Sequence, residues 1–176
     1  SIAEGAFAYN TNIEMIALNA SNGVYYTENY KVSELDMSTM QLVQKDVSVL
    51  YKVGELSGRE LLHYCAGNGV SSYTIPSDVV RVCDYAFACS PHDLKFVSNL
   101  RNISIADDNA LETIGKEAFA YLTSIDSIIL HSLPNLSSVG IGDKTFYQSF
   151  YNANDNANKT NIKFKILMFD LNGATS

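Results

Sequence analysis

Aliphatic residues recur along this chain at spacings that repeat from one segment to another. After Phe119, aliphatic residues follow at plus six, nine and eleven, and the same three offsets follow Phe7. In each phrase the last two aliphatics alternate with polar or small residues, which is the period-two pattern of a strand with one buried face. We therefore expect each phrase to form a short strand, with Ile128 and Leu130 pointing inward.

The dipeptide Ala-Phe is a second marker of the repeat. It occurs at Ala6-Phe7, Ala86-Phe87 and Ala118-Phe119, with a weaker copy at Thr145-Phe146. After Phe87 the aliphatic phrase comes seven residues late, at residues 100–105, which indicates an insertion through residues 90–93. A small Ala permits close approach, so we expect about one helical turn here, with the Phe of each unit stacked on the next. No single unit can bury this face alone, and the units should therefore share one core.

These phrases are similar to a known repeat. Residues 72–89 and 111–119 resemble the BspA-like leucine-rich repeat, which reads roughly L-x-x-I-x-I-P-x-x-V-x-x-I-x-x-x-A-F-x-x-C. The four repeat phenylalanines are 80, 32 and 27 residues apart, and the last two intervals approach the 20–29 residues of leucine-rich repeats. In the long interval, Val49-Leu50-Tyr51 and the run 61–67 match a longer segment that family members carry. The resemblance implies an α/β repeat solenoid, a right-handed β-α superhelix that is rich in strands and has short helical turns.

The repeats suggest one leucine-rich-repeat domain over residues 1–176. We expect a repeat at 1–18, an irregular long repeat or insertion at 19–72, further repeats at 73–146 and a C-terminal cap at 147–176. In the cap, Ile162, Phe164 and Ile166 alternate with two lysines, a pattern that discourages pairing at a strand edge. Because Ser1 is not preceded by Met and the pattern begins within a repeat, we expect a fragment of a longer chain.

Composition limits the classes of partner. Of the 176 residues 47% are hydrophobic, enough for a shared core, and the formal net charge is −7. No basic field is available to attract phosphate backbones, so we expect no nucleic-acid partner. No stretch approaches 18 consecutive apolar residues, and we expect no membrane insertion within this fragment.

The residues with the most reactive chemistry do not fall into a recognised site. A metal constellation would draw on His63, Cys65, Cys83, Cys89 and His92. Their spacing lacks the close pairs of structural zinc sites, so we interpret Cys89 as a small buried residue, and a disulfide from Cys65 to Cys83 or Cys89 stays open. No nucleophile motif or phosphate-binding glycine loop is present. We therefore expect no enzyme activity, no metal and no cofactor.

The outward positions of the expected strands form the candidate binding face. These positions are Met15, Ala17, Asn19, Asn102, Ser104, Ala106, Ser127, Ile129 and His131. They are small, polar and nearly uncharged, which suits broad contact with a protein. The resemblance implies an extracellular or cell-surface protein that binds other proteins, including host extracellular-matrix or cell-surface proteins, in adhesion. Two alternatives are a glycan-binding module, with a site at Tyr25, Tyr26 and Tyr30, and a purely structural spacer.

Overall fold

The structure is a computed structural model that describes residues 1–19, 21–54, 58–90, 99–130, 133–136, 140–147 and 149. In this part of the chain strands dominate and the one helix is a short 3-10 turn. The elements are β1 (Tyr25–Asp36), β2 (Gln41–Val53), β3 (Arg59–Tyr64), η1 (Ala66–Asn68), β4 (Ser72–Ile75), β5 (Val79–Val82), β6 (Asn102–Ile105), β7 (Thr113–Ile114) and β8 (Ser127–Ile129).

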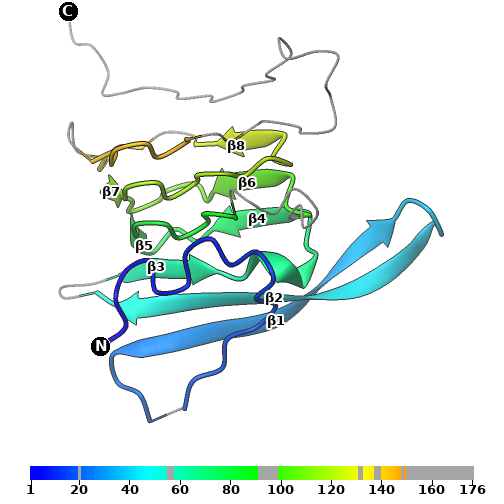
Figure 1. Cartoon of the computed structure of the whole chain (residues 1–176), viewed down its shortest axis with the longest axis horizontal. Helices are drawn as coiled ribbons and strands as arrows, with labels where there is room; N and C mark the ends of the chain where they lie inside the picture. Colours follow the sequence, from blue (N-terminus) through cyan, green and yellow to red (C-terminus); the bar gives the residue numbers. More distant parts are fainter. Residues whose placement is uncertain are drawn as a thin grey trace, which may run out of the picture.

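The strands form two sheets, and from β3 onward the chain alternates between them (Figure 1). One sheet has five strands in the order β1-β2-β3-β5-β7, and the other has three parallel strands in the order β4-β6-β8. From β4 onward each passage through the three-stranded sheet is followed by a strand or bridge in the other sheet, ending with the bridge between Ile114 and Ile141. Each repeat unit therefore adds one short parallel strand to each sheet.

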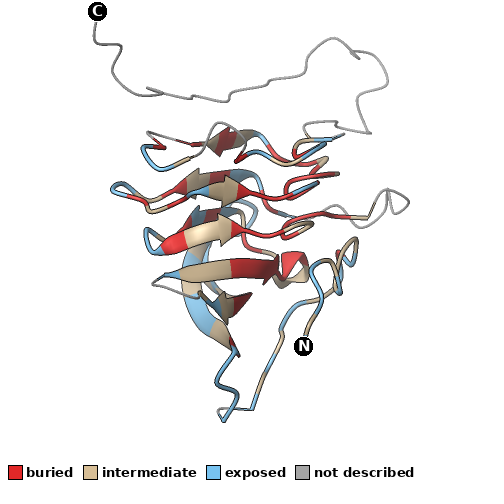
Figure 2. Ribbon diagram, turned by 90° about the vertical axis from the view of Figure 1, so that its left-hand side faces the viewer, coloured by how far each residue is buried: buried red, intermediate tan, exposed pale blue. Residues whose placement is uncertain are grey.

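The core lies between the two sheets. Ile103 and Ile128 from the three-stranded sheet share a buried cluster with Val82 and Ile114 from the five-stranded sheet. Buried residues (red in Figure 2) recur along successive strands of the stack. The expected inward orientation of Ile128 and Leu130 is confirmed, since both are buried. The alternation of aliphatic and polar residues thus sets which face of each strand is covered.

An aromatic column runs through the core. The rings of Phe87 and Phe119 are stacked with centroids 5.1 Å apart, and those of Phe119 and Phe146 with centroids 5.5 Å apart. This confirms the expected stacking for these three units. Below them Tyr64, at the end of β3, stacks on Phe87 at 5.2 Å and occupies the place of a repeat phenylalanine. The irregular segment therefore contributes a ring to the column without an Ala-Phe dipeptide.

The Ala-Phe segments are β-turns, and the expectation of a helical turn is wrong. The N–H of Ala86 donates to the Cys83 carbonyl at 3.3 Å, and that of Ala88 donates to the Tyr85 carbonyl at 3.1 Å. The residue two places before each repeat phenylalanine has a positive φ, with values of 73° at Gly5, 61° at Tyr85, 50° at Glu117 and 53° at Lys144. A left-handed residue interrupts the helical φ/ψ series, so consecutive turns form instead.

Residues 1–19, here called the N-terminal strap, add no strand to either sheet, although the N–H of Tyr9 donates to the carbonyl of Ala88 in the next unit at 3.2 Å. The strap forms no strand and crosses the five-stranded sheet, with Ile16 donating its N–H to Ser48 Oγ on β2 at 3.0 Å (Figure 1). Phe7 lies against His63, 5.6 Å between ring centroids, instead of extending the aromatic column. The expectation that the first repeat adds a rung to the binding face is therefore wrong for its three residues, Met15, Ala17 and Asn19.

The longest feature in the interval between the first two Ala-Phe markers is a β-hairpin formed by β1 and β2. β1 and β2 pair antiparallel over twelve residue pairs, from Tyr25 with Lys52 to Asp36 with Gln41, and β2 then pairs antiparallel with β3. β3 is parallel to β5. The hairpin therefore ends the five-stranded sheet on the side away from β7 and extends beyond the repeat stack (Figure 1).

Several expectations concern residues outside the described part of the chain. These are the C-terminal cap expected at 147–176, of which only residues 147 and 149 are described, including the alternation at 162–166, and the residues His92 and His131. Among the helices that the structure does describe, none is long and apolar enough to cross a membrane.

Candidate functional site

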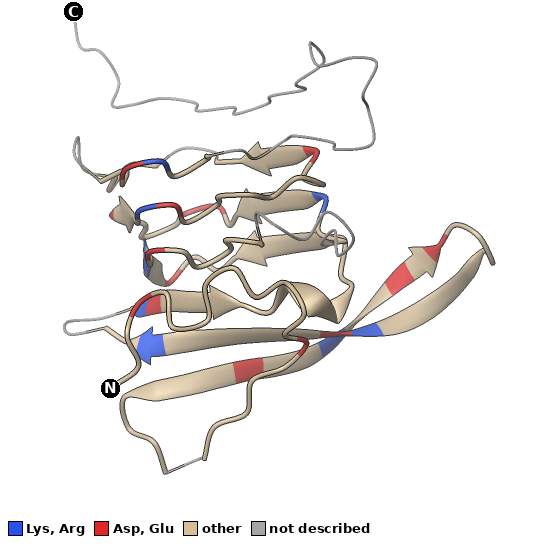
Figure 3. Ribbon diagram, in the orientation of Figure 1, with Lys and Arg blue, Asp and Glu red and all other residues tan. Residues whose placement is uncertain are grey.

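Five of the six outward side chains of the three-stranded sheet are polar, and the sixth is Ile129. Because the parallel strands are in register, Ser72, Asn102 and Ser127 lie at one level and Thr74, Ser104 and Ile129 at the next. We call these six residues the ladder face. Their strands contain no Lys, Arg, Asp or Glu, and in Figure 3 charge appears only where β6 and β8 begin, directly after Arg101 and Asp126.

The polar groups of the ladder face bond to one another across the strands. The Ser127 hydroxyl donates to Asn102 Oδ1 at 2.7 Å, and Asn102 Nδ2 donates to Ser72 Oγ at 3.5 Å. The hydroxyls of Thr74 and Ser104 lie 2.9 Å apart. These bonds orient the short side chains in fixed rows, so the face presents a preorganised array of hydroxyl and amide groups to solvent.

Sequence reasoning found part of this face. Asn102, Ser104, Ser127 and Ile129 lie together on it, and Ala106 follows directly after β6 with its N–H bonded to the Ile75 carbonyl at 2.9 Å. The first rung of the face is instead β4, whose outward residues Ser72 and Thr74 were missed. The phrase Ser72-Tyr73-Thr74-Ile75 shows the same alternation of polar and apolar residues as Asn102-Ile103-Ser104-Ile105. This alternation is the sequence signal that identifies β4 as a strand of the face.

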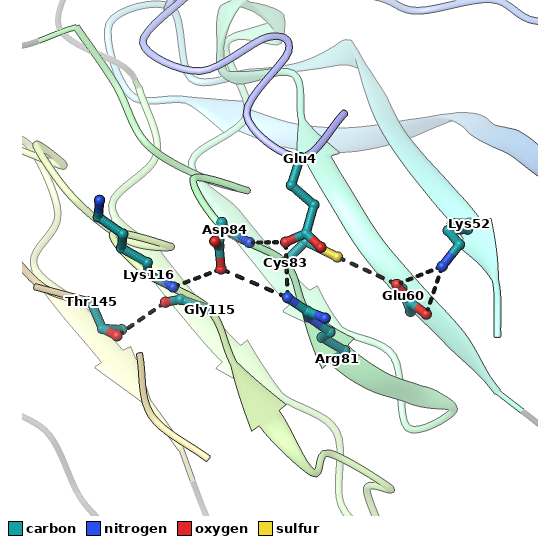
Figure 4. A network of polar contacts seen from close by, with 9 residues as sticks. All are labelled: Glu4, Lys52, Glu60, Arg81, Cys83, Asp84, Gly115, Lys116 and Thr145. Carbon is teal, nitrogen blue, oxygen red and sulfur yellow. Dashed lines mark hydrogen bonds and ion pairs between the residues drawn. The ribbon is translucent and has the colours of Figure 1, made fainter. Parts of the chain in front are cut away.

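A second polar region lies on the five-stranded sheet (Figure 4). Glu4 of the strap accepts hydrogen bonds from Arg81 Nη2 at 2.9 Å and from the N–H of Asp84 at 3.0 Å. Asp84 Oδ1 in turn accepts the N–H of Lys116 at 2.9 Å. On this sheet the charged side chains therefore hold the strap in place and link successive turns by hydrogen bonds.

Part of this network borders a cavity of about 340 Å³. The lining residues are Arg81, Asp84, Thr113, Ile114, Gly115, Lys116, Gly140 and Gly142. Two of its glycines are required by packing, since a Cβ on Gly115 would lie 2.4 Å from the Asp84 nitrogen and one on Gly142 would lie 2.3 Å from the Lys116 nitrogen. The glycines are there because the repeat units pack closely at this place. The side chains of Arg81 and Asp84 already form hydrogen bonds to other residues of the chain. We therefore rank the cavity below the ladder face.

The cysteines and His63 are buried framework residues. All three cysteines are free, and burial raises the pKa of Cys65 to about 11 and those of Cys83 and Cys89 to about 12. The thiols are therefore protonated near neutral pH, whereas nucleophiles and metal ligands need the thiolate. Within the described ranges, no group of three or more His, Cys, Asp or Glu residues could hold a metal ion.

The three tyrosines of the glycan hypothesis do not form one platform. Tyr25 is buried, and its hydroxyl accepts the N–H of Ile2 at 3.0 Å. Tyr26 stacks on Tyr51 with ring centroids 5.5 Å apart. Tyr30 is the exposed member, at 45%. Since neighbouring strand residues point to opposite faces, Tyr25 lies across the sheet from Tyr26 and Tyr30.

Comparison with known proteins agrees with this architecture. The chain matches the family model of the BspA type leucine rich repeat region, with six copies, over residues 60–152 and 94–169, which is more than half of its length. No curated protein and no solved structure gives a significant match.

Proposed function

The chain belongs to the BspA-type leucine-rich repeat family, and from this premise we propose that it is a non-enzymatic, secreted or cell-surface module that binds other proteins in adhesion. The family supports a protein-interaction or adhesion module in general. The extracellular setting, and a host-matrix or cell-surface protein as partner, are parts of the proposal. Leucine-rich repeats present variable outward positions on a constant framework, so the ladder face is the surface proposed to bind.

The observation that carries this proposal is the in-register row of short, uncharged side chains on β4, β6 and β8. Their hydroxyl and amide groups are fixed by mutual hydrogen bonds, yet Ser72, Thr74 and Asn102 are exposed. Such a surface can exchange hydrogen bonds with a partner's backbone and polar side chains over several strands. It lacks the charge that would favour an ionic small molecule.

Binding of the purified 176-residue protein to an array of extracellular-matrix proteins and glycans tests the proposal. The variant Ser104→Arg with Ile129→Arg places two bulky charges on adjacent strands of the ladder face. We expect it to reduce binding to any protein hit at least tenfold, because two large cations prevent close approach. A matched variant, Gln41→Arg with Gln44→Arg, adds the same charge at exposed positions of β2 and should bind as the parent does.

Other outcomes contradict the proposal in distinct ways. Protein binding that survives both ladder substitutions would place the site elsewhere. Binding to glycans alone would favour the glycan-binding alternative, with Tyr30 as the exposed aromatic residue. Binding to neither proteins nor glycans would favour the structural-spacer alternative.

We also infer that the repeat units wind as a right-handed superhelix. The support is the alternation of short parallel strands between two sheets, since connections between parallel strands are right-handed in nearly all proteins. A crystal structure of the chain tests this handedness directly.

A further inference from the structure

β1 ends the five-stranded sheet with an edge that no other described strand covers. Its twelve residues pair with β2 on one side, and the sheet order places β1 outermost. Figure 1 shows β1 at the end of the stack opposite β8. A long edge strand exposes a row of backbone donors and acceptors that can pair with another strand. β1 has no proline, and its register with β2 is unbroken.

The direction of the β1 backbone groups follows from the first pair of the hairpin. The N–H of Val53 donates to the Val24 carbonyl at 2.9 Å, one step beyond the pair of Tyr25 and Lys52. Hydrogen-bonded and non-hydrogen-bonded pairs alternate in an antiparallel ladder. Even-numbered residues of β1 therefore direct their backbone groups to β2, and odd-numbered residues direct theirs outward.

Within the described residues, the outward row has no backbone partner over most of its length. The N–H of Tyr25 points outward and is already bonded to Asn22 Oδ1 at 2.9 Å. For Thr27, Asn29, Lys31 and Ser33, the described part of the chain provides no backbone partner on the outer side. Four consecutive outward donors and acceptors are thus available for a strand from another molecule.

From this edge we propose that two copies of the chain associate through antiparallel pairing of their β1 strands, with Tyr30 on the twofold axis. This register joins four outward pairs, in which Thr27 faces Ser33 and Asn29 faces Lys31 of the second copy, each twice. On the other face Glu28 meets Val32, and the two Tyr30 rings meet each other. Tyr30 is 45% exposed in the single chain, and cross-strand aromatic pairs stabilise sheets.

Charge and hydrogen bonding disfavour the neighbouring registers. A centre at Lys31 would oppose the two Lys31 side chains and would place Glu28 against Glu34. A centre at Val32 would place Glu28 against Asp36 of the second copy. Like charges directly opposite one another destabilise a strand pair. A centre at Asn29 would leave three outward pairs instead of four, because the N–H of Tyr25 is already bonded to Asn22.

Molar mass in solution tests the association. Light scattering during size-exclusion chromatography, from about 1 to 300 µM, should show a rise from 19.3 kDa towards twice that mass. Ser33→Pro removes one outward donor and leaves the β1–β2 bonds intact, so it should weaken association at least tenfold, whereas Ser33→Ala keeps the donor and should associate as the parent does. Thermal unfolding of both variants checks that the hairpin remains folded. A parent that stays monomeric throughout this range overturns the proposal.

Cysteine cross-linking tests the register independently of proline. Residues at position 30 form a non-hydrogen-bonded pair on the axis, where Cα atoms are about 4.5 Å apart and within disulfide range. Tyr30→Cys should therefore give a disulfide-linked dimer under mild oxidation, and the three native cysteines are buried and should remain free. Leu42→Cys is exposed on β2 and serves as the control for random collision. Equal cross-linking of the two variants would refute the proposed pairing. Neither experiment involves the ladder face, so failure here leaves the proposed adhesive function untouched.

Discussion

Replacing Phe119 tests whether the aromatic column holds the repeat units together. Its side chain is fully buried, at 0% exposure, and its ring stacks on Phe87 at 5.1 Å and on Phe146 at 5.5 Å. Phe119→Ala removes both ring contacts and leaves a cavity between two units. We expect a loss of about 3–5 kcal/mol in the free energy of unfolding, the usual range for a buried Phe replaced by Ala.

Two further variants separate the causes of this loss. Phe119→Leu keeps most of the apolar volume but removes both ring stacks, each worth about 0.5–1.5 kcal/mol, so about 1–3 kcal/mol should be lost. Phe146 is half-buried and has one ring neighbour among the described residues, so Phe146→Ala should cost less than Phe119→Ala, about 1–2 kcal/mol.

Urea unfolding followed by circular dichroism measures these differences at a constant slope. The order of the three losses matters more than any single value, because burial and stacking both predict a large effect at Phe119. A loss below about 1 kcal/mol for Phe119→Ala would refute the stacked-column model. A Phe119→Leu variant as stable as the parent would show that ring stacking adds nothing to burial.

The other expectations concern backbone strain, a buried histidine and the thiols. Lys144 has a φ of 53°, so Lys144→Gly should raise the free energy of unfolding by roughly 0.5–1 kcal/mol in urea titration, and no gain would argue against strain there. Burial lowers the pKa of His63 from 6.5 to about 4. The unfolded chain therefore binds a proton before the folded one, and up to about 3 kcal/mol of stability should be lost as pH falls from 6.5 to 4. His63→Leu should flatten that decline in unfolding measured across this window, and an unchanged slope would contradict the assignment. Cys65, Cys83 and Cys89 should react with a thiol reagent at neutral pH only as the chain opens, and rapid labelling of the native protein would refute their burial.

The repeat units were predictable from sequence because their geometry is local. A strand with one covered face needs only the alternation seen at Ile103 and Ile128, and both residues are buried as expected. The stacking of Phe87, Phe119 and Phe146 follows in turn, since parallel strands in register bring equivalent residues of each unit to one level. Local pattern and tertiary contact agree over this part of the chain.

The strap shows where this reasoning stops. Ile16 and Leu18 have the spacing of Ile128 and Leu130, yet they pack against the cluster of Tyr25, Leu50, Leu62 and Cys83 on the five-stranded sheet. The spacing of aliphatic residues predicts which side chains share a face of a segment. It does not predict which part of the protein covers that face. The strap packs on this sheet because the hairpin provides a second apolar face. The repeat pattern is weak over residues 25–53, so the sequence did not predict that face.

The ladder face is energetically separate from the core, and this separation makes the binding experiment interpretable. Its polar groups bond across the strands to one another, whereas the alternating residues Tyr73, Ile103 and Ile128 carry the packing. Ser104 and Ile129 are half-buried and lie opposite each other on β6 and β8, so two Arg side chains there repel each other and should cost up to about 1 kcal/mol. Arg at positions 104 and 129 should therefore alter the surface without unfolding the units, so a loss of partner binding would report on contact. A large loss of stability in the same variant would show instead that the outward row supports the fold.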